Sequence, residues 1–161
     1  MTLPFLKSPP GETPVIVEGH FRATPARVFR AWTEPDEIVQ WFGTHTLSSA
    51  EIDLRVGGTW RFLFADTGNG RSILQGSYTD VSPNDRLAFT WVHEHARTDG
   101  VIETTPESQV TITFAPERDG TFVRLVHAGI QRVEGRSGVG QGWNASFERL
   151  QAIAEGREVA A

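Results

Sequence analysis

Apolar and polar residues alternate along the middle of the chain, from Thr46 to Ile130, and again over Val15–Phe21. A period of two is typical of β-strands, and the breaks fall where glycine, proline, asparagine and aspartate cluster. The pattern predicts strands near 15–21, 46–55, 59–66, 71–81, 86–94, 108–116 and 121–129. Apart from a longer loop at 95–107, the turns from 46 onward are short, so successive strands must pair antiparallel, as a meander.

One face of this predicted sheet is apolar. Side chains two residues apart on a strand share a face. The predicted inner face consists of Trp60, Phe62, Phe64, Leu87, Phe89, Trp91, His93, Val110, Ile112, Phe114, Val123, Leu125 and His127. The positions between them, such as Arg61, Thr111 and Arg124, are polar and are expected to face water. An apolar element must therefore cover the inner face.

Two short helices are predicted after the first strand. Thr24 followed by Pro25 is typical of a helix start, because the hydroxyl can accept a hydrogen bond from a free amide and proline loses no bond at the first position. Pro35 disfavours helical geometry at Glu34, so the first helix ends there and a second begins, which Gly43 ends.

The C-terminal segment predicts the element that covers the sheet. Trp143, Phe147, Leu150 and Ala154 recur at spacings of four, three and four, which makes an apolar stripe on a helix. The predicted fold class is therefore α+β: a curved antiparallel sheet of about seven strands wrapped around a long C-terminal helix, with two short helices after the first strand.

Three glycines precede this stripe, at Gly138, Gly140 and Gly142. Their spacing fits neither the dinucleotide-binding fingerprint nor a P-loop, and no lysine follows them. We interpret them as a flexible gate at the mouth of a pocket.

The length of 161 residues suits a single domain, because one core of this size buries enough apolar surface to be stable. Residues 14–157 are expected to form it. Residues 1–13, with Pro4, Pro9, Pro10 and Gly11, have no sustained periodicity and are expected to form a loose N-terminal arm.

Composition narrows the function. The net charge of −5 disfavours a nucleic-acid partner, which would need clustered Lys and Arg. The absence of cysteine excludes disulfides, thiolate zinc sites and cysteine nucleophiles. No apolar run approaches the roughly 20 residues that cross a bilayer, and the first residues lack the order of a signal peptide, so we expect a cytoplasmic protein with no membrane partner.

Six motifs together resemble a known family: Thr24–Thr33 (TPARVFRAWT), Trp41–Gly43 (WFG), Asp53–Gly58 (DLRVGG), Gly76–Tyr78 (GSY), Asp85–Trp91 (DRLAFTW) and Gly142–Trp143 (GW). They are similar to the bacterial proteins related to the activator of the ninety-kilodalton heat-shock chaperone's ATPase, within the START-like, or SRPBCC, superfamily that includes the birch-pollen allergen. The resemblance runs from about Val15 to Glu155. It implies a helix-grip fold with a cavity between the long helix and the sheet, and it implies little about chemistry.

Aromatic residues are the candidates for the wall of that cavity, because large rings line cores and ligand pockets. The alternative is a solid core that the rings fill. The candidate ligand-binding residues are Trp41, Phe42, Trp60, Phe62, Tyr78, Phe89, Trp91, His127, Trp143 and Phe147.

Three residues are candidates for acid–base catalysis: His93, His127 and Tyr78. An imidazole titrates near neutrality and could shuttle a proton on a bound carbonyl compound, and one intervening strand would separate the two histidines by roughly 10 Å. The alternative is that each imidazole anchors a ligand or satisfies a backbone carbonyl. His93 and His95 share a face, but no further metal-ligand motif follows, so we expect neither a metal nor another cofactor.

These observations favour a protein that binds a small hydrophobic ligand, aromatic or polyketide-like, in an internal cavity. One alternative is a cyclase or dehydratase that uses the same cavity. Another is a chaperone-interacting or stress-response protein, or a homodimer that pairs through an edge strand and exposed aromatic residues.

Overall fold

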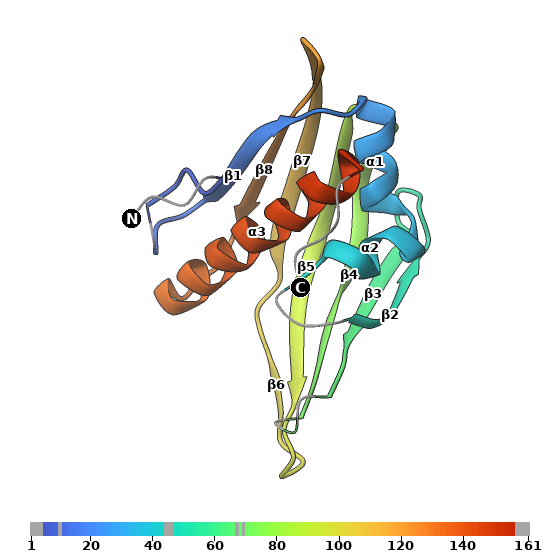
Figure 1. Cartoon of the computed structure of the whole chain (residues 1–161). Coiled ribbons are helices and arrows are strands. Elements are labelled where there is room, and N and C mark those ends of the chain that lie inside the picture. The colour runs from blue at the N-terminus through green and yellow to red at the C-terminus, as the bar shows by residue number, and fades with distance from the viewer. Residues whose placement is uncertain (1–4, 10, 44–46, 67, 69, 157–161) are drawn as a thin grey trace.

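A curved antiparallel sheet carries helices on one face in the computed structural model (Figure 1). The structure describes residues 5–9, 11–43, 47–66, 68 and 70–156. The elements along these residues are β1 (Val15–Phe21), α1 (Pro25–Thr33), α2 (Pro35–Trp41), β2 (Leu47–Ile52), β3 (Thr59–Phe64), β4 (Arg71–Ser82), β5 (Arg86–Ala96), β6 (Ile102–Thr104), β7 (Ser108–Glu117), β8 (Gly120–Ala128) and α3 (Val133–Ala154).

The strand order is β1-β8-β7-β5-β4-β3-β2, with β6 paired to β5. Every pair is antiparallel, as the short turns predicted, and β1 joins the sheet beside β8. The long helix α3 crosses one face of the sheet, with α1 and α2 beside its C-terminal part (Figure 1). The predicted α+β, helix-grip arrangement is confirmed.

Most of the predicted inner face is buried under the helices, and Phe64, Trp91 and His93 are half-buried. Phe62 lies opposite Leu74, and His127 lies opposite Val110, all with buried side chains. Between them Arg61 and Arg124 are exposed, as the alternation predicted. The apolar stripe of α3 is also confirmed, since Trp143, Phe147, Leu150 and Ala154 are all buried.

Local signals set the ends of α1 and α2 as predicted. The Thr24 hydroxyl accepts a hydrogen bond from the Arg27 amide at 3.1 Å, with Pro25 at the start of α1. Arg27 and Arg30 donate to the Glu37 carboxylate at 2.6 and 3.0 Å, so ionic contacts join α1 to α2.

The interpretation of the three glycines as a flexible gate is wrong. Gly138, Gly140 and Gly142 lie within α3, which begins at Val133. A Cβ at Gly140 would lie 3.3 Å from Leu6 Cδ1, so close packing explains the absence of a side chain there. A tertiary contact thus outweighs the low helix propensity of glycine.

The segment before β1 is not loose where the structure describes it. Phe5 and Leu6 are each 8% exposed, and their amides donate to Asn144 Oδ1 of α3 at 2.9 and 3.0 Å. The Phe5 ring lies on β1 at Gly19, where a Cβ would be 2.7 Å from the ring. These two residues complete the core because Asn144 accepts their amide hydrogen bonds and Gly19 leaves space for the Phe5 ring.

The predicted loop at 95–107 also contains regular structure. The strand β5 continues to Ala96 and pairs with β6, and the Thr105 amide donates to the His93 carbonyl at 2.9 Å. Exposed side chains on β6 gave no apolar alternation by which to predict this strand.

Candidate functional site

Two aromatic regions lie on the inner face of the sheet. The first, which we call the α1–α2 cavity, is a small hollow between the two short helices and strands β3 to β5. Its wall consists of Trp32, Ile38, Phe42, Trp60, Phe62, Tyr78, Leu87 and Phe89. Five of these were predicted as ligand-binding residues: Phe42, Trp60, Phe62, Tyr78 and Phe89.

The α1–α2 cavity has a volume of only about 10 Å³. A ligand pocket usually has a volume of roughly 300 to 1,000 Å³, so this hollow is far smaller than the open cavity expected between α3 and the sheet. Rings fill the space instead: Phe42 contacts Phe62 with centroids 4.9 Å apart, and Trp60 contacts Phe89 at 5.3 Å. The remaining hollow lies beneath α1 and α2.

Two indole nitrogens in the wall of the cavity have no hydrogen-bond partner in the described part of the chain. They are Nε1 of Trp32 and Nε1 of Trp60, whose side chains are buried. An unpaired buried N–H costs about 1–3 kcal/mol, and most buried polar groups in native proteins are paired. Gly76 leaves space beside Trp60, because a Cβ there would lie 2.8 Å from Nε1 and 1.9 Å from the Thr90 carbonyl oxygen.

The second region, which we call the His127 cluster, consists of Trp91, Ser108, His127 and Trp143. The Trp143 indole donates to His127 Nδ1 at 3.1 Å, and His127 Nε2 lies 2.8 Å from the Ser108 hydroxyl. Because an indole N–H can only donate, Nδ1 accepts and the imidazole proton resides on Nε2. The Ser108 hydroxyl in turn donates to the Trp91 carbonyl at 3.4 Å.

This chain of bonds decides what His127 can do. Burial lowers the pKa of His127 from 6.5 to about 3, so the ring is neutral at physiological pH. Both ring nitrogens are engaged by Ser108 and Trp143, which leaves neither free for a substrate proton. The geometry therefore matches the alternative in which His127 is a satisfied core histidine that joins the sheet to α3.

Tyr78 and His93 differ from His127 in their surroundings. Burial raises the pKa of the Tyr78 phenol well above its usual value, so it remains a protonated donor in the α1–α2 cavity. Burial, together with the nearby His95, lowers the pKa of His93, which is half-buried on β5.

Strand register offsets the two histidines along the sheet. Through Val110, His127 lies in register with Phe89, four residues from His93 along β5. Four residues span about 13 Å along an extended strand. The expected separation of roughly 10 Å counted only the strands crossed and left out this offset. Whether the two histidines contribute to one site stays a prediction. Among the described residues, no group of three or more His, Asp or Glu side chains could hold a metal.

Two predicted wall residues belong to neither region. Trp41 is buried, but its indole donates to the Ala31 carbonyl at 2.9 Å between α2 and α1. Phe147 packs against Phe5 and Phe21, with centroids 5.7 and 5.8 Å away. Both complete the core around the helices.

Three residues of the cavity wall were not predicted as site residues: Trp32, Ile38 and Leu87. Their apolar periodicity was visible in the sequence, and Leu87 was assigned to the inner face. How α1 and α2 would lie over the sheet was not visible, so no signal distinguished these residues from the rest of the core.

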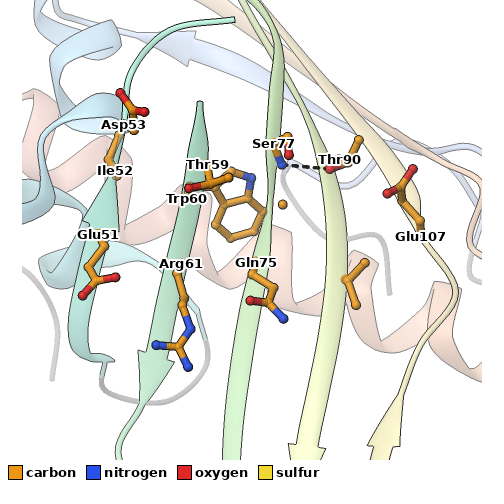
Figure 2. Close-up of a pocket in the computed structure, with 12 residues that line it drawn as sticks. Glu51, Ile52, Asp53, Thr59, Trp60, Arg61, Gln75, Ser77, Thr90 and Glu107 are labelled. Carbon is orange, nitrogen blue, oxygen red and sulfur yellow. Dashed lines mark hydrogen bonds between the residues drawn. The ribbon is translucent and has the colours of Figure 1, made fainter. Parts of the chain in front are cut away.

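The outer face of the sheet carries a wide, open groove of about 600 Å³, shown in Figure 2. Its lining is mostly polar side chains of β2 to β5, among them Glu51, Arg61, Gln75 and Thr90, and it also includes the predicted ligand-binding residue Trp60. The Ser77 amide donates to the Thr90 hydroxyl at 2.9 Å across β4 and β5 (Figure 2). This is the face predicted to be solvated, and none of the predicted catalytic residues is in its lining.

An antiparallel sheet that holds a long C-terminal helix over an aromatic interior defines the helix-grip class. A family model described as "Activator of Hsp90 ATPase homolog 1-like protein" matches residues 22–155. The chain belongs to this family, as the sequence motifs indicated. No curated protein matches the chain.

Solved structures agree with this assignment. An uncharacterised protein from Rhizobium leguminosarum is 27% identical over 90% of this chain and 95% of its own, with a TM-score of 0.75. CalU16 from Micromonospora echinospora is 26% identical, covering 92% of this chain and 81% of its own, with a TM-score of 0.62. A protein from Arthrobacter aurescens, 17% identical, shares the fold with a TM-score of 0.77 over 99% of this chain and 96% of its own.

No helix in the described part of the chain has the length and apolar character needed to cross a membrane.

Proposed function

We propose that this protein binds a small hydrophobic molecule in the interior, at the α1–α2 cavity. The observation that carries the proposal is the wall of this cavity, which is apolar or aromatic at every position and contains no charged side chain. Membership of a family that commonly binds hydrophobic ligands supports it. Ring faces provide large apolar contact areas, worth about 25 cal/mol per Å² buried.

A ligand must enlarge the cavity by moving the helices that cover it. The polar contacts of α2 connect it to the other helices: Glu37 to α1, and the carbonyls of Trp41 and Gly43 to the guanidinium of Arg149 on α3. Its contact with the sheet includes the ring pair Phe42–Phe62, which has no directional bond to break. A bound ring can therefore replace the contacts between the cover and the sheet.

The enzyme alternative finds less support in the geometry. A general base needs an accessible nitrogen within reach of the substrate, whereas both nitrogens of His127 are engaged and its pKa is about 3. The Tyr78 phenol remains in the cavity as a hydrogen-bond donor, which suits orientation of a ligand.

The test is a thermal-shift and calorimetric titration with apolar ring probes such as naphthalene and fluorene. A ligand that binds only the folded state raises the stability by about 2.7 kcal/mol at a concentration of 100 Kd. We expect the wild-type melting temperature to rise with probe concentration.

A matched pair of variants locates the binding. Leu87 lines the cavity and Leu125 does not, although both are buried on the inner face. Leu87→Phe should abolish the thermal shift, and Leu125→Phe should retain it. If a variant does not fold, probe-induced shifts of the methyl signals of Leu87 and Leu125 in the wild type make the same comparison. Failure of every probe, or equal loss in both variants, would refute the proposal.

A further inference from the structure

Both residues with an unpaired indole donor line the same hollow, and Trp60 also reaches the lining of the outer groove. Trp32 comes from α1 and Trp60 from β3, their side chains are 3% and 2% exposed, and their Nε1 atoms have no partner among the described residues. Two other buried indoles are paired: Trp41 donates to Ala31, and Trp143 donates to His127. Among the described residues, the fully buried indole nitrogens without a partner are therefore those of two residues that line the α1–α2 cavity.

We infer that the ligand of this cavity is a neutral carbonyl compound, whose oxygen accepts hydrogen bonds from the indole N–H groups of Trp32 and Trp60. The inference rests on the proposed function and adds the chemical class of the ligand. A carbonyl oxygen has two lone pairs and can accept from both donors. A ligand with two carbonyl oxygens, such as a quinone, would serve each donor separately.

The absence of charge in the cavity wall favours a neutral acceptor over an anion. The wall holds indole, phenyl, phenol and aliphatic side chains only. A carboxylate would be buried there without a cation, which is strongly unfavourable, whereas a ketone or quinone exposes only a dipole. A cation is disfavoured because no carboxylate lines the wall to neutralise it, and the two indole N–H groups can only donate.

A pure hydrocarbon is a poorer match, because it would fill the space and leave both donors unpaired. A single trapped water is the other competing occupant, since the hollow of about 10 Å³ is at the lower limit for one water. The experiment must separate a carbonyl ligand from both.

The probes are 9-fluorenone and fluorene, two rigid molecules of nearly the same shape that differ by the carbonyl oxygen. Calorimetry gives the affinity of each for the wild-type protein. We expect 9-fluorenone to bind about 5- to 30-fold more tightly, which corresponds to one or two net hydrogen bonds. In ¹H–¹⁵N spectra, 9-fluorenone should move the indole signals of Trp32 and Trp60 downfield, and fluorene should not.

Three variants connect the preference to the donors. Trp32→Phe and Trp60→Phe keep an aromatic ring but remove the N–H, so each should lower the ratio of the two affinities. Trp41→Phe is the control, because its indole is already bonded to Ala31, and the ratio should be retained even if both affinities change. The ratio cancels effects of ring size that are common to both probes.

The outcomes separate the ligand class from the binding function. Binding of both probes with equal affinity, or a ratio unchanged by both Trp32→Phe and Trp60→Phe, would overturn the carbonyl inference and leave the proposed function standing. A long-lived water bonded to both indoles and unmoved by 9-fluorenone would also overturn the inference. Binding of neither probe would overturn both proposals.

Discussion

Two groups of tryptophans lie on the inner face of the sheet, and they differ in what surrounds their indole nitrogens. In the His127 cluster, the Trp143 N–H donates to His127, whose other nitrogen meets Ser108. In the α1–α2 cavity, the N–H groups of Trp32 and Trp60 have no partner among the described residues. Tryptophan therefore has two different roles. In the His127 cluster its N–H forms a hydrogen bond that holds α3 to the sheet, and in the α1–α2 cavity its N–H is a donor without an acceptor.

The difference indicates in which region a ligand can form the most new hydrogen bonds. In a network whose hydrogen bonds are all satisfied, entry of a ligand would break some of those bonds. Two donors without acceptors gain hydrogen bonds when a ligand binds. Stability measurements on the His127 cluster and binding measurements on the α1–α2 cavity should accordingly respond to different substitutions.

The largest expected effect is the dependence of stability on pH that His127 causes. Its pKa is about 3 in the folded protein and about 6.5 for an imidazole exposed to water, so the unfolded state binds the proton first. The contribution of His127 to the free energy of unfolding should be fully present above about pH 6.5. It should fall by roughly 4 to 5 kcal/mol towards pH 3. His93, whose pKa is also lowered, adds to the loss in the same direction.

Urea unfolding from pH 7.5 to pH 4 measures this slope, and the same series on His127→Phe isolates the contribution of His127. Parallel curves for the two proteins would show that His127 does not carry the dependence.

His127→Phe at pH 7.5 should have the next largest effect. The substitution leaves the Trp143 N–H without its acceptor and changes the packed volume, for a loss of about 3 kcal/mol in the free energy of unfolding. The control is His20→Phe, at an exposed pair with Glu117, which should cost less than about 1 kcal/mol. Similar losses in both variants would mean that the His127 cluster is not a cohesive network.

Trp143→Phe and Trp60→Phe compare the two regions directly, since both indoles are buried on the inner face. Trp143→Phe leaves His127 Nδ1 unpaired, whereas Trp60→Phe removes a donor that has no partner. We expect Trp143→Phe to be the more destabilising by about 2 kcal/mol, measured by chemical denaturation. An equal cost for both would contradict the assignment of the Trp60 N–H as unpaired.

Ser108→Ala should have the smallest effect, because it removes one hydroxyl and little volume. The His127 Nε2–H loses its acceptor, and the expected loss is about 1 kcal/mol. Ser108→Thr, which keeps the hydroxyl, should recover part of the loss in the same assay. No difference between Ala and Thr at this position would show that the hydroxyl is not needed.

Much of the fold could be predicted because its signals are local. Alternation on β3, β5, β7 and β8 identified the inner face, and Thr24, Pro25 and Pro35 identified two short helices. The Arg55 Nε lies 2.9 Å from Asp53 Oδ2, in an ion pair between residues two apart in the chain. These features depend on residues close together in the chain.

The candidate site was predicted only in part. Phe42, Trp60, Phe62, Tyr78 and Phe89 were correctly placed on one wall, but Trp32, Ile38 and Leu87 were not included. Whether they bind a ligand stays a prediction. The position of the hollow under α1 and α2, away from Trp143 and Phe147, depends on how the short helices lie on the sheet.

By itself, the sequence determined the helices, the strands that alternate apolar and polar residues, and the side of the sheet on which each ring lies, because the pleat of a strand and the turn of a helix repeat over a few residues. Only the tertiary structure decided how much space those rings leave and which indole nitrogens find an acceptor. Both outcomes depend on side chains from β3, β5, β8, α1 and α3 meeting in three dimensions. The burial of Phe5 against Gly19 and Asn144 has the same cause.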